Sequence, residues 1–412
     1  MIRIMPSEIR GRIKPPASKS HAQRLIAASL LVSEKTIIKN LGQSDDVLSA
    51  IAIAKLCKQV SFLGDVYEAN GKMSFANDTI FSCGESALCA RMFTPILATS
   101  GKNFTVNAEK TLLKRPVVNE LYYLANMGLK LGANGDFLPI NILSGKLKAG
   151  NYSPKVSVSS QFASGLLMSL PTCNGDSILN IKNIVSRPYI DLSLAVMNSC
   201  GIELDERENG VFFIKGNQKY SGFEQEVESD WSSAVFWILA AALCGDITIE
   251  KLNFNSKQAD MDFMQILKLA KIKFTINADE LRVEKSVPQA FNFDFTNSPD
   301  LFPAAAVLAS FANGTSIFSG ISRLAHKESN RLQHIIDSFN LLGINTNLNG
   351  DILKIQGGEP KSHQTLNSHG DHRLAMAFSI MALASKHGLT IENTECVSKS
   401  YPGFYQDLRS LT

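Results

Sequence analysis

Basic side chains recur where polar stretches of this sequence turn into apolar ones. A cation at such a junction repels the positive end of a helix dipole unless an anion is bound there. Arginine suits bidentate binding of carboxylates and phosphates, and lysine supplies a compact charge. The pattern therefore predicts a receptor for phosphates and carboxylates. The residues concerned are Lys19, Arg24, Arg91, Arg115, Lys327, Arg331, Arg373 and Lys399.

Two acidic residues fall among these cations. Asp300 lies in the segment SPDLFP, and Glu328 directly follows Lys327 in HKESNR. Acids inside an anion receptor weaken binding and make sense mainly if they move protons, so they favour an enzyme over a noncatalytic phosphate- or nucleic-acid-binding protein. Taken singly, Asp300 also suits a helix N-cap, and Glu328 with Arg331 suits an exposed ion pair. The occurrence of both acids among the cations favours a catalytic role over these structural ones.

The elements that position these residues form a repeat at intervals of roughly 70 residues. Each segment opens with good N-cap residues and continues with apolar residues at three- and four-residue steps, which predicts a capped, buried helix. The six segments span residues 18–31, 84–97, 159–170, 229–243, 298–311 and 369–383.

Short β-like runs lie between the helical segments, so the predicted fold class is mixed α/β. Six such units divide into three plus three, which predicts two similar domains with helices buried inside sheets. Helix N-termini aimed at a common cleft would then bind phosphates and carboxylates. The runs include residues 36–41, 103–108, 155–160, 177–184, 211–216, 246–252, 315–321, 353–358 and 389–395.

Composition excludes several classes of protein. The chain has 412 residues, 45% of them hydrophobic and 19% charged, which predicts a globular protein of two domains. A formal charge of +3 is too small to predict a nucleic-acid-binding face. The longest apolar run, from Ala234 to Cys244, is too short to span a bilayer, and the N-terminus lacks an apolar signal core. We expect Trp231 and Trp237 to pack in the core.

Cysteine and histidine usage predicts no disulfide framework and no metal. The seven cysteines are scattered and never closely paired, which suits a reducing cytoplasm. His369 and His372 are three residues apart, but no further ligand completes a metal set nearby. Because no dinucleotide fingerprint, P-loop or HExxH motif is present, catalysis is expected to need neither a metal nor a nucleotide cofactor.

The order and spacing of the motifs resemble those of the 5-enolpyruvylshikimate-3-phosphate synthases from end to end. That resemblance implies two inside-out α/β domains, each of three βαβαββ units. Residues 17–228 would form one domain and residues 1–16 with 229–412 the other, with a two-strand hinge near 15–18 and 228–230. The motifs are PPASKSHAQRLIAASLL, CGESALCARM, LLKRPV, VSSQFASGLLM, SRPYID, ESDWSSA, SPDLFPAAAVLA, HKESNRL, HGDHRLAMAF and VSKSYPGFYQDL.

The resemblance also implies an activity in the shikimate pathway, which leads to chorismate and the aromatic amino acids. The enolpyruvyl group of phosphoenolpyruvate would pass to the 5-hydroxyl of shikimate 3-phosphate through a tetrahedral intermediate, with release of phosphate. The residues implied to bind phosphoenolpyruvate are Lys19, Ala87, Arg115, Gln161, Arg331, Arg373 and Lys399. Those implied to bind shikimate 3-phosphate are Lys19, Ser20, Arg24, Ser159, Ser160, Gln161, Ser186, Asp300, Arg323 and Lys327.

The reaction needs an acid and a base. Asp300 is the candidate to accept the hydroxyl proton, Glu328 the candidate to exchange protons with C3, and Lys19 could share either role. His372 is expected to lie near the phosphate, with Asp371 capping the following helix. A monomer is expected, because two domains that close on substrate can supply the whole site within one chain.

Two related enzymes compete with this interpretation. The UDP-N-acetylglucosamine enolpyruvyl transferases carry Lys-Asn in the first motif and a reactive cysteine in a glycine-rich loop. Here Ser20 follows Lys19, and Cys83 and Cys89 flank the GESALC turn as packed small residues. The RNA 3′-terminal phosphate cyclases need a nucleotidylated histidine, for which HGDHR is poor evidence.

The sequence departs from the family pattern in two places. The family often carries Asn or His and then Arg ahead of HKESNR, where this chain has Arg323, Leu324 and Ala325, and Asn330 replaces a frequent Asp. Ala87 stands where the family commonly has glycine in Asn-Ala-Gly. Its methyl group should crowd any ligand bulkier than phosphoenolpyruvate, because glycine there permits close approach of the backbone.

The substitution Ala87→Gly tests this crowding. We predict that wild type is less sensitive than the variant to glyphosate, a longer mimic of phosphoenolpyruvate, because the methyl group is removed. Inhibition constants of the two proteins, measured against phosphoenolpyruvate, decide the matter. Equal constants would remove the idea.

Overall fold

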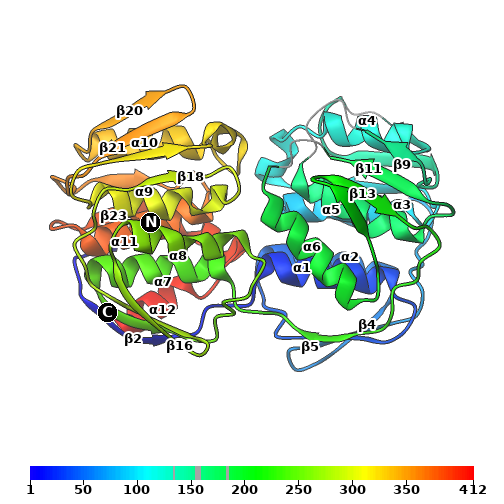
Figure 1. Ribbon diagram of the computed structural model, residues 1–412, viewed down its shortest axis with the longest axis horizontal. Coiled ribbons are helices and arrows are strands. Elements are labelled where there is room, and N and C mark those ends of the chain that lie inside the picture. Colours follow the sequence, from blue (N-terminus) through cyan, green and yellow to red (C-terminus); the bar gives the residue numbers. More distant parts are fainter. Residues whose placement is uncertain (133–134, 154–158, 182–184) are drawn as a thin grey trace. The chain divides into compact units, whose positions relative to one another are not determined.

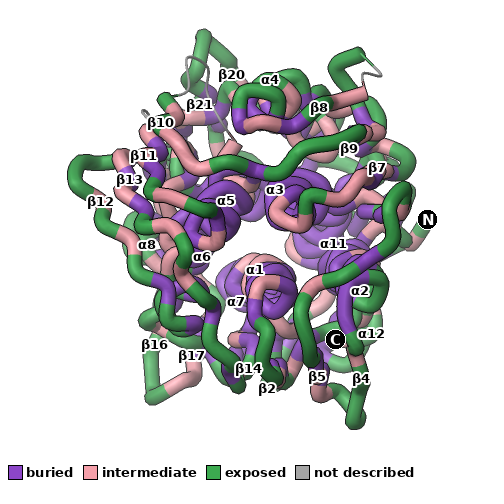
Figure 2. The backbone as a smooth tube through the Cα atoms, turned by 90° about the vertical axis from the view of Figure 1, so that its right-hand side faces the viewer, coloured by how far each residue is buried: buried purple, intermediate pink, exposed green. Residues whose placement is uncertain are grey.

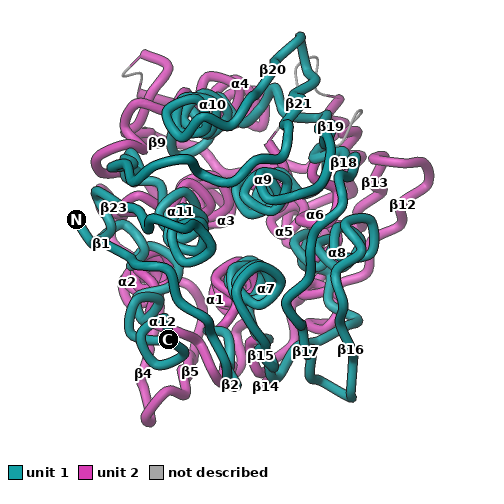
Figure 3. The backbone as a smooth tube through the Cα atoms, turned by 90° about the vertical axis from the view of Figure 1, so that its left-hand side faces the viewer, with its two compact units in different colours: residues 1–16, 228–412 teal, residues 17–227 magenta. Residues whose placement is uncertain are grey.

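The chain forms two compact units. The computed structural model describes residues 1–132, 135–153, 159–181 and 185–412. Unit 1 comprises Met1–Pro16 and Glu228–Thr412, and unit 2 comprises Ala17–Val227. Both ends of the chain therefore belong to unit 1 (Figures 1 and 3).

A buried helix bundle forms the centre of each unit. In unit 2 it contains α1 (Lys19–Leu31), α3 (Thr94–Ala98) and α5 (Ser160–Ser169), and Figure 2 shows these helices almost wholly buried. In unit 1 it contains α7 (Trp231–Cys244), α9 (Phe302–Ser310) and α11 (His372–Ala384), which lie together in Figure 3. These helices are apolar on nearly every side, and such a helix is stable only when protein surrounds it. The predicted buried helices are confirmed.

Four of the predicted N-caps are present. The side chains of Ser18, Ser159, Asp230 and Asp371 each accept a backbone N–H bond from the first turn of the helix that follows. Such a bond satisfies one of the donors that a helix start leaves open. The segment 84–97 differs from prediction, because it begins as a π-helix, η1 (Cys89–Phe93), before α3. Pro95 has no N–H to donate to the preceding turn, which accounts for the irregular start.

Small sheets enclose each bundle, six in all among the described residues. In unit 2 they are β14 (Glu224–Glu226)-β3 (Thr36–Lys39)-β5 (Val66–Asn70)-β4 (Gln59–Leu63), β6 (Thr79–Ser82)-β7 (Phe104–Asn107)-β9 (Ile140–Gly145)-β8 (Leu129–Gly132), and β10 (Asn151–Tyr152)-β11 (Ser177–Asn180)-β13 (Val211–Ile214)-β12 (Asp205–Glu208). In unit 1 they are β16 (Lys273–Asn277)-β17 (Glu280–Glu284)-β15 (Gly245–Ile249)-β2 (Ile9–Ile13), β18 (Asn292–Asp294)-β19 (Thr315–Ser319)-β21 (Ile352–Gln356)-β20 (Thr346–Asn349), and β1 (Ile2–Ile4)-β23 (Leu389–Glu392)-β22 (Thr365–Asn367).

Two of the sheets, one in each unit, share one connectivity. Strands β6 and β7 pair in parallel, β7 and β9 pair antiparallel, and β8 pairs antiparallel with β9; β18 to β21 repeat this order. A parallel pair requires a crossover connection, which a central helix supplies in each case. Eight of the nine predicted β runs contain a strand, although residues 182–184 lie outside the described residues. In the run 155–160, residues 155–158 also lie outside them, and Ser159 and Ser160 are the N-cap and first residue of α5 instead of part of a strand.

Amphipathic helices and short 3₁₀ turns complete the units. On α10 (Arg331–Leu341) the buried residues include Leu332, Ile335 and Phe339, at the spacing of one helical face. The other outer helices are α2 (Asp45–Cys57), α4 (Val118–Asn126), α6 (Arg187–Ser199), α8 (Phe263–Leu269) and α12 (Phe404–Leu411). The 3₁₀ turns are η2 (Lys110–Lys114), η3 (Leu170–Thr172), η4 (Ala259–Asp262), η5 (Pro299–Leu301), η6 (Ser322–His326) and η7 (Thr394–Lys399).

Two predictions about packing in the core are confirmed. Trp231 and Trp237 are fully buried in unit 1, and Cys83 and Cys89 are buried in unit 2. The seven cysteines are all free thiols. Within the described ranges, every helix is too short or too polar to traverse a lipid bilayer.

Gly165 lets α5 approach the π-helix closely. A β-carbon at this position would lie 2.5 Å from the carbonyl oxygen of Met92 and 2.6 Å from Cγ of Pro95. Alanine favours a helix by about 1 kcal/mol over glycine. Here crowding should dominate, because the neighbouring atoms are backbone and proline ring.

We therefore predict that Gly165→Ala lowers the free energy of unfolding by about 1–3 kcal/mol. Urea unfolding followed by far-ultraviolet circular dichroism measures it. The control is Gly358→Ala, where a β-carbon would have open space. An unchanged or raised stability in Gly165→Ala would contradict the close packing of α5.

Candidate functional site

The N-termini of the three central helices of unit 1 meet at Arg373. Its Nη2 donates to Ser232 Oγ at the start of α7 (3.1 Å) and to Asp300 Oδ2 just ahead of α9 (3.3 Å). Arg373 itself lies in the first turn of α11. A guanidinium at a helix N-terminus is unfavourable by itself, so the acidic neighbours explain how it is tolerated.

Arg331 is the buried centre of a cluster of charged side chains in unit 1, called the unit 1 cluster below. Its side chain is 1% exposed, and its Nε and Nη2 donate to the two carboxylate oxygens of Asp371 at 2.7 and 3.3 Å. Its Nη1 donates to Asp300 Oδ1 at 2.6 Å. Burial alone would lower the pKa of Arg331, but the charges of Asp371, Asp300 and Glu328 raise it above its usual value. The guanidinium therefore stays charged.

Asp300 contacts three cations of unit 1. Besides Arg331 and Arg373, the Nζ of Lys327 lies 3.4 Å from Asp300 Oδ1. Burial by itself would raise the pKa of Asp300, and the positive charges of Arg373, Lys327 and Arg331 more than reverse this, so that the pKa lies well below its usual value. Asp300 is thus a carboxylate at neutral pH.

Glu328 has a similar setting. Its carboxylate lies 2.7 Å from His372 Nδ1, 3.3 Å from Lys399 Nζ and 3.9 Å from Arg331 Nη2. Burial opposes ionisation, but His372 and Lys399 hold the pKa of Glu328 well below its usual value. The interpretation of Glu328 and Arg331 as an exposed ion pair is wrong, because their side chains are only 14% and 1% exposed.

Unit 2 contains a buried arginine of a different kind. Arg24 on α1 is 1% exposed, and it donates to Ser193 Oγ (2.7 Å), the Ser20 carbonyl (2.8 Å) and the Tyr189 carbonyl (3.0 Å). Within the described ranges, all its hydrogen-bond acceptors are neutral. Burial lowers the pKa of Arg24 to about 10, so it remains charged at neutral pH. Such a cation attracts an anion more strongly than one already paired.

A second group in unit 2 surrounds the start of α1. Lys19 Nζ pairs with Asp46 Oδ2 at 2.9 Å. On the next turn, the Oε1 of Gln23 accepts bonds from Ser86 Oγ (3.2 Å) and Cys89 Sγ (3.4 Å). These bonds tie α1 to the turn that carries the buried Ala87.

Arg91 joins the third helix start of unit 2 to these elements. It pairs with Glu120 at 2.7 Å and donates to Gln161 Oε1 at 3.4 Å, in the first turn of α5. The N-cap Ser159 also donates to Glu120, at 3.4 Å. Arg91 further donates to the Pro116 carbonyl at 3.0 Å, directly after Arg115. The helix starts in unit 2 therefore converge, as they do in unit 1.

The remaining predicted residues are placed as follows. Ser186 is the buried N-cap of α6 and has a left-handed backbone, with φ of 61°. Ser160 opens α5 beside Ser159. Arg323 lies on η6 in unit 1, where its Nη2 donates to the Thr296 carbonyl.

One group of side chains in unit 1 has the composition of a metal site. Atoms of Glu328, Asp371 and His372 lie within 4.8 Å of one another. Both carboxylates already pair with cations, Arg331 and Lys399, which would repel a metal ion. The donor set therefore does not fit a resident metal. His369 stacks instead on His334, with ring centroids 3.5 Å apart.

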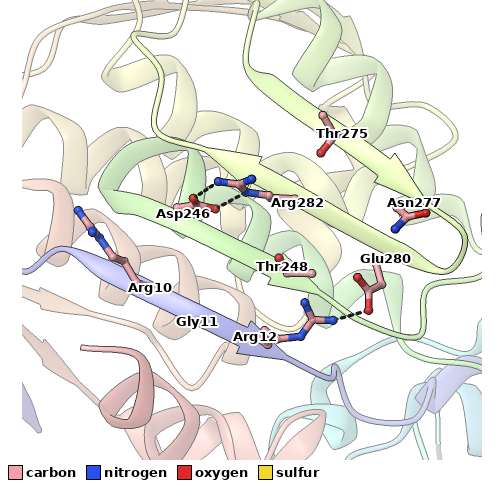
Figure 4. Close-up of a pocket in the computed structure, with 9 residues that line it drawn as sticks. All are labelled: Arg10, Gly11, Arg12, Asp246, Thr248, Thr275, Asn277, Glu280 and Arg282. Atoms are coloured by element: carbon pink, nitrogen blue, oxygen red, sulfur yellow. Dashed lines mark hydrogen bonds and ion pairs between the residues drawn. The ribbon is translucent and has the colours of Figure 1, made fainter.

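A hollow of about 500 Å³ lies over the exposed face of the sheet β16-β17-β15-β2 (Figure 4). Two of the arginines that line it are already paired with carboxylates. Arg282 pairs with Asp246 at 2.6 Å, and Arg12 pairs with Glu250 at 2.5 Å and with Glu280. These are cross-strand ion pairs, which suit a solvated sheet face.

Comparison with known proteins shows which family the chain belongs to. Residues 4–408 match the family model described as EPSP synthase (3-phosphoshikimate 1-carboxyvinyltransferase). The chain belongs to the EPSP synthase family. Curated relatives named 3-phosphoshikimate 1-carboxyvinyltransferase include proteins of Clostridium acetobutylicum (34% identical, covering 100% of this chain and 97% of the relative) and Brachyspira hyodysenteriae (33% identical, 99% and 98%).

Solved structures of similar proteins support the fold of the EPSP synthase family. An EPSP synthase from Acinetobacter baumannii has a TM-score of 0.84 at 22% identity, covering 99% of this chain and 97% of that one. The enolpyruvyl transferase NikO from Streptomyces tendae has a TM-score of 0.79 at 14% identity, covering 99% and 96%. The predicted resemblance and the predicted α/β fold are confirmed.

Three acidic residues of this EPSP synthase family member escaped the sequence analysis. Asp46 pairs with Lys19, Glu120 with Arg91, and Asp260 with Arg373. The acidic pair in QSDDV was the available signal for Asp46. Nothing near Glu120 or Asp260 in the sequence distinguishes it from an ordinary surface acid.

The lowered pKa values of Asp300 and Glu328 predict acid sensitivity in unit 1. Both groups bind protons more weakly when folded, so their ion pairs stabilise the fold above their unfolded pKa values. This stabilisation should be lost progressively as the pH falls from about 5 through the depressed pKa values of the folded protein. In Asp300→Asn the free energy of unfolding should fall less over that range, and should be lower than wild type at neutral pH.

Tryptophan fluorescence during urea unfolding reports on unit 1, because both tryptophans lie there. Glu359→Gln, at an exposed ion pair with Lys386, serves as the control. If the free energy of unfolding fell equally with pH in Asp300→Asn and in wild type, Asp300 would not be a source of the acid sensitivity.

Proposed function

We propose that this protein transfers the enolpyruvyl group of phosphoenolpyruvate to the 5-hydroxyl of shikimate 3-phosphate, releasing phosphate. The observation that carries the proposal is the unit 1 cluster, in which two ionised carboxylates lie among cations at converging helix N-termini. Full-length relatives named 3-phosphoshikimate 1-carboxyvinyltransferase support the same activity. The reaction would be a step in the shikimate pathway to aromatic amino acids.

The cations and polar groups of both units would bind the two anionic substrates. Arginine clamps and helix N-termini suit phosphate and carboxylate groups. For phosphoenolpyruvate we propose Lys19, Ala87, Arg115, Gln161, Arg331, Arg373 and Lys399. For shikimate 3-phosphate we propose Lys19, Ser20, Arg24, Ser159, Ser160, Gln161, Ser186, Asp300, Arg323 and Lys327.

The carboxylates would move the protons. The 5-hydroxyl oxygen adds to C2 of phosphoenolpyruvate and passes its proton to Asp300, while C3 takes a proton from Glu328, which must be protonated at this stage. Phosphate then leaves C2 with the proton from Asp300, and Glu328 recovers a proton from C3. In the ligand-free protein both carboxylates are weak bases, because nearby cations depress their pKa values. A bound anion that shares those cations would raise both pKa values and prepare the carboxylates for proton transfer.

Lys19 suits a binding role better than a proton-transfer role. Its ammonium lies 2.9 Å from the Asp46 carboxylate, which favours the charged form. It would therefore act first as a cation for the substrates. A share in the proton transfers would need a bound ligand to alter that pair.

Residues near 15–18 and 228–230 would form a hinge on which the two domains close. The backbone N–H of Asp230 donates to the Pro16 carbonyl at 2.8 Å, so the two connections are joined by a hydrogen bond. Closure would exclude water from the reacting groups.

We further propose a monomer acting in the cytoplasm, without nucleic acid, membrane or metal partner. Light scattering that shows a tight dimer would overturn the first point.

Phosphate release tests the activity. The purified protein is given phosphoenolpyruvate alone, shikimate 3-phosphate alone, and both together, with UDP-N-acetylglucosamine as the control acceptor. We expect phosphate release only when phosphoenolpyruvate and shikimate 3-phosphate are given together. Release only with the nucleotide sugar would assign the activity to the other enolpyruvyl transferases, and no release with any acceptor would contradict catalysis.

The two proposed catalytic carboxylates allow a sharper test. We predict that Asp300→Ala and Glu328→Ala each lower kcat roughly 100- to 10,000-fold, because proton transfer is lost. Anion affinity should be kept or increased, because a negative charge leaves the cluster. Steady-state kinetics and calorimetric binding of phosphoenolpyruvate measure the two effects, with Glu359→Ala as the surface control. Tighter anion binding with turnover equal to wild type would favour a noncatalytic role for both carboxylates.

A further inference from the structure

A buried aspartate of unit 1 lies beyond the residues assigned so far. Asp260, on the 3₁₀ turn η4, has a side chain only 2% exposed. Its Oδ2 accepts a hydrogen bond from Ser232 Oγ and lies 3.4 Å from Arg373 Nη1. Its Oδ1 is buried and makes no hydrogen bond to another described residue. Burying a half-satisfied carboxylate is costly, so a specific role is expected.

Arg373 lies between two carboxylates. Nη1 faces Asp260 Oδ2 (3.4 Å) and the Asp300 carbonyl (3.2 Å), while Nη2 faces Ser232 Oγ (3.1 Å) and Asp300 Oδ2 (3.3 Å). Asp260 therefore engages Nη1, and Ser232 shares Nη2 with the Asp300 carboxylate, so neither nitrogen is bonded to that carboxylate alone. Without them Arg373 could turn fully onto Asp300 as a bidentate pair.

We propose that Asp260 is a positioning residue, which together with Ser232 keeps Arg373 available to the anionic substrate and prevents it from closing on Asp300. This inference rests on the proposed function, in which Arg373 binds phosphoenolpyruvate. Asp260 touches no reacting atom and acts through Arg373.

The charge on Asp260 sets how firmly it holds Arg373. Burial raises the pKa of Asp260 to about 6, Arg373 opposes that rise, and the negative charges of Asp300 and Asp230 add to it. The same turn also carries Asp262, and the neighbouring α8 carries the exposed Lys268. Asp260 is thus ionised and holds Arg373 firmly above about pH 6, whereas below that pH it becomes neutral and the hold weakens.

The test compares wild type with Asp260→Asn, which keeps the size of the side chain and removes the charge. The KM for phosphoenolpyruvate is measured between about pH 5 and about pH 7.5, and its ratio between variant and wild type removes the titration of the substrate itself. We expect a ratio near one at the acidic end and a roughly 10-fold higher KM in the variant at the upper end, with a smaller change in kcat. A ratio independent of pH would reduce Asp260 to a structural residue and overturn the proposal.

Two further measurements make the outcome specific. Asp262→Asn, on the same turn, should give a KM ratio near one at every pH, and a profile like that of Asp260→Asn would contradict the proposal. Calorimetric binding of phosphoenolpyruvate, with and without shikimate 3-phosphate, is independent of turnover. A pH-dependent affinity difference in a protein that shows no turnover would support the role of Asp260 while contradicting the proposed catalysis. No binding by wild type would overturn both.

Discussion

The buried guanidinium of Arg331 is the interaction on which the organisation of unit 1 depends. It bonds to Asp371, which caps α11, and to Asp300, which lies directly ahead of α9, from its own place at the start of α10. Removing one partner of a buried ion pair typically costs about 3–5 kcal/mol, because the other charge remains buried without compensation. Arg331 therefore fixes three segments at once, and the candidate catalytic carboxylate Asp300 is held by a charge in the protein interior.

Cations at helix N-termini require compensation, and the chain supplies it internally. Among the described residues, the unit 1 cluster pairs Lys327, Arg331, Arg373 and Lys399 with Asp260, Asp300, Glu328 and Asp371. In unit 2, Lys19 pairs with Asp46 and Arg91 with Glu120. Most of the cations proposed to bind the substrates are thus the same side chains that form buried ion pairs in the protein without ligand. Under the proposed function, an incoming anion would exchange partners with these carboxylates, so these paired cations would be compensated both with and without ligand.

Local patterns made the fold and part of the site predictable from the sequence. N-caps such as Ser18, Ser159 and Asp371 and the fully apolar helices that follow them depend on neighbours only a few residues away. The acidic partners depend on tertiary structure. Asp46 is 27 residues from Lys19 and Asp260 is 113 residues from Arg373, and no periodicity links positions so far apart. The π-helix at Cys89–Phe93 escaped prediction because Pro95 interrupts a pattern that otherwise reads as a regular helix.

The two fully buried arginines show how one residue type can serve opposite purposes. Arg24 is surrounded by neutral acceptors and burial lowers its pKa to about 10, so none of its described hydrogen-bond acceptors compensates its positive charge. Arg331 is surrounded by carboxylates and its pKa is raised, so an anion that contacts it must share it with Asp300 and Asp371. Under the proposed function, Arg24 would therefore contribute mainly to affinity. A ligand that shares Arg331 would change the proton affinity of Asp300 and so couple binding to proton transfer.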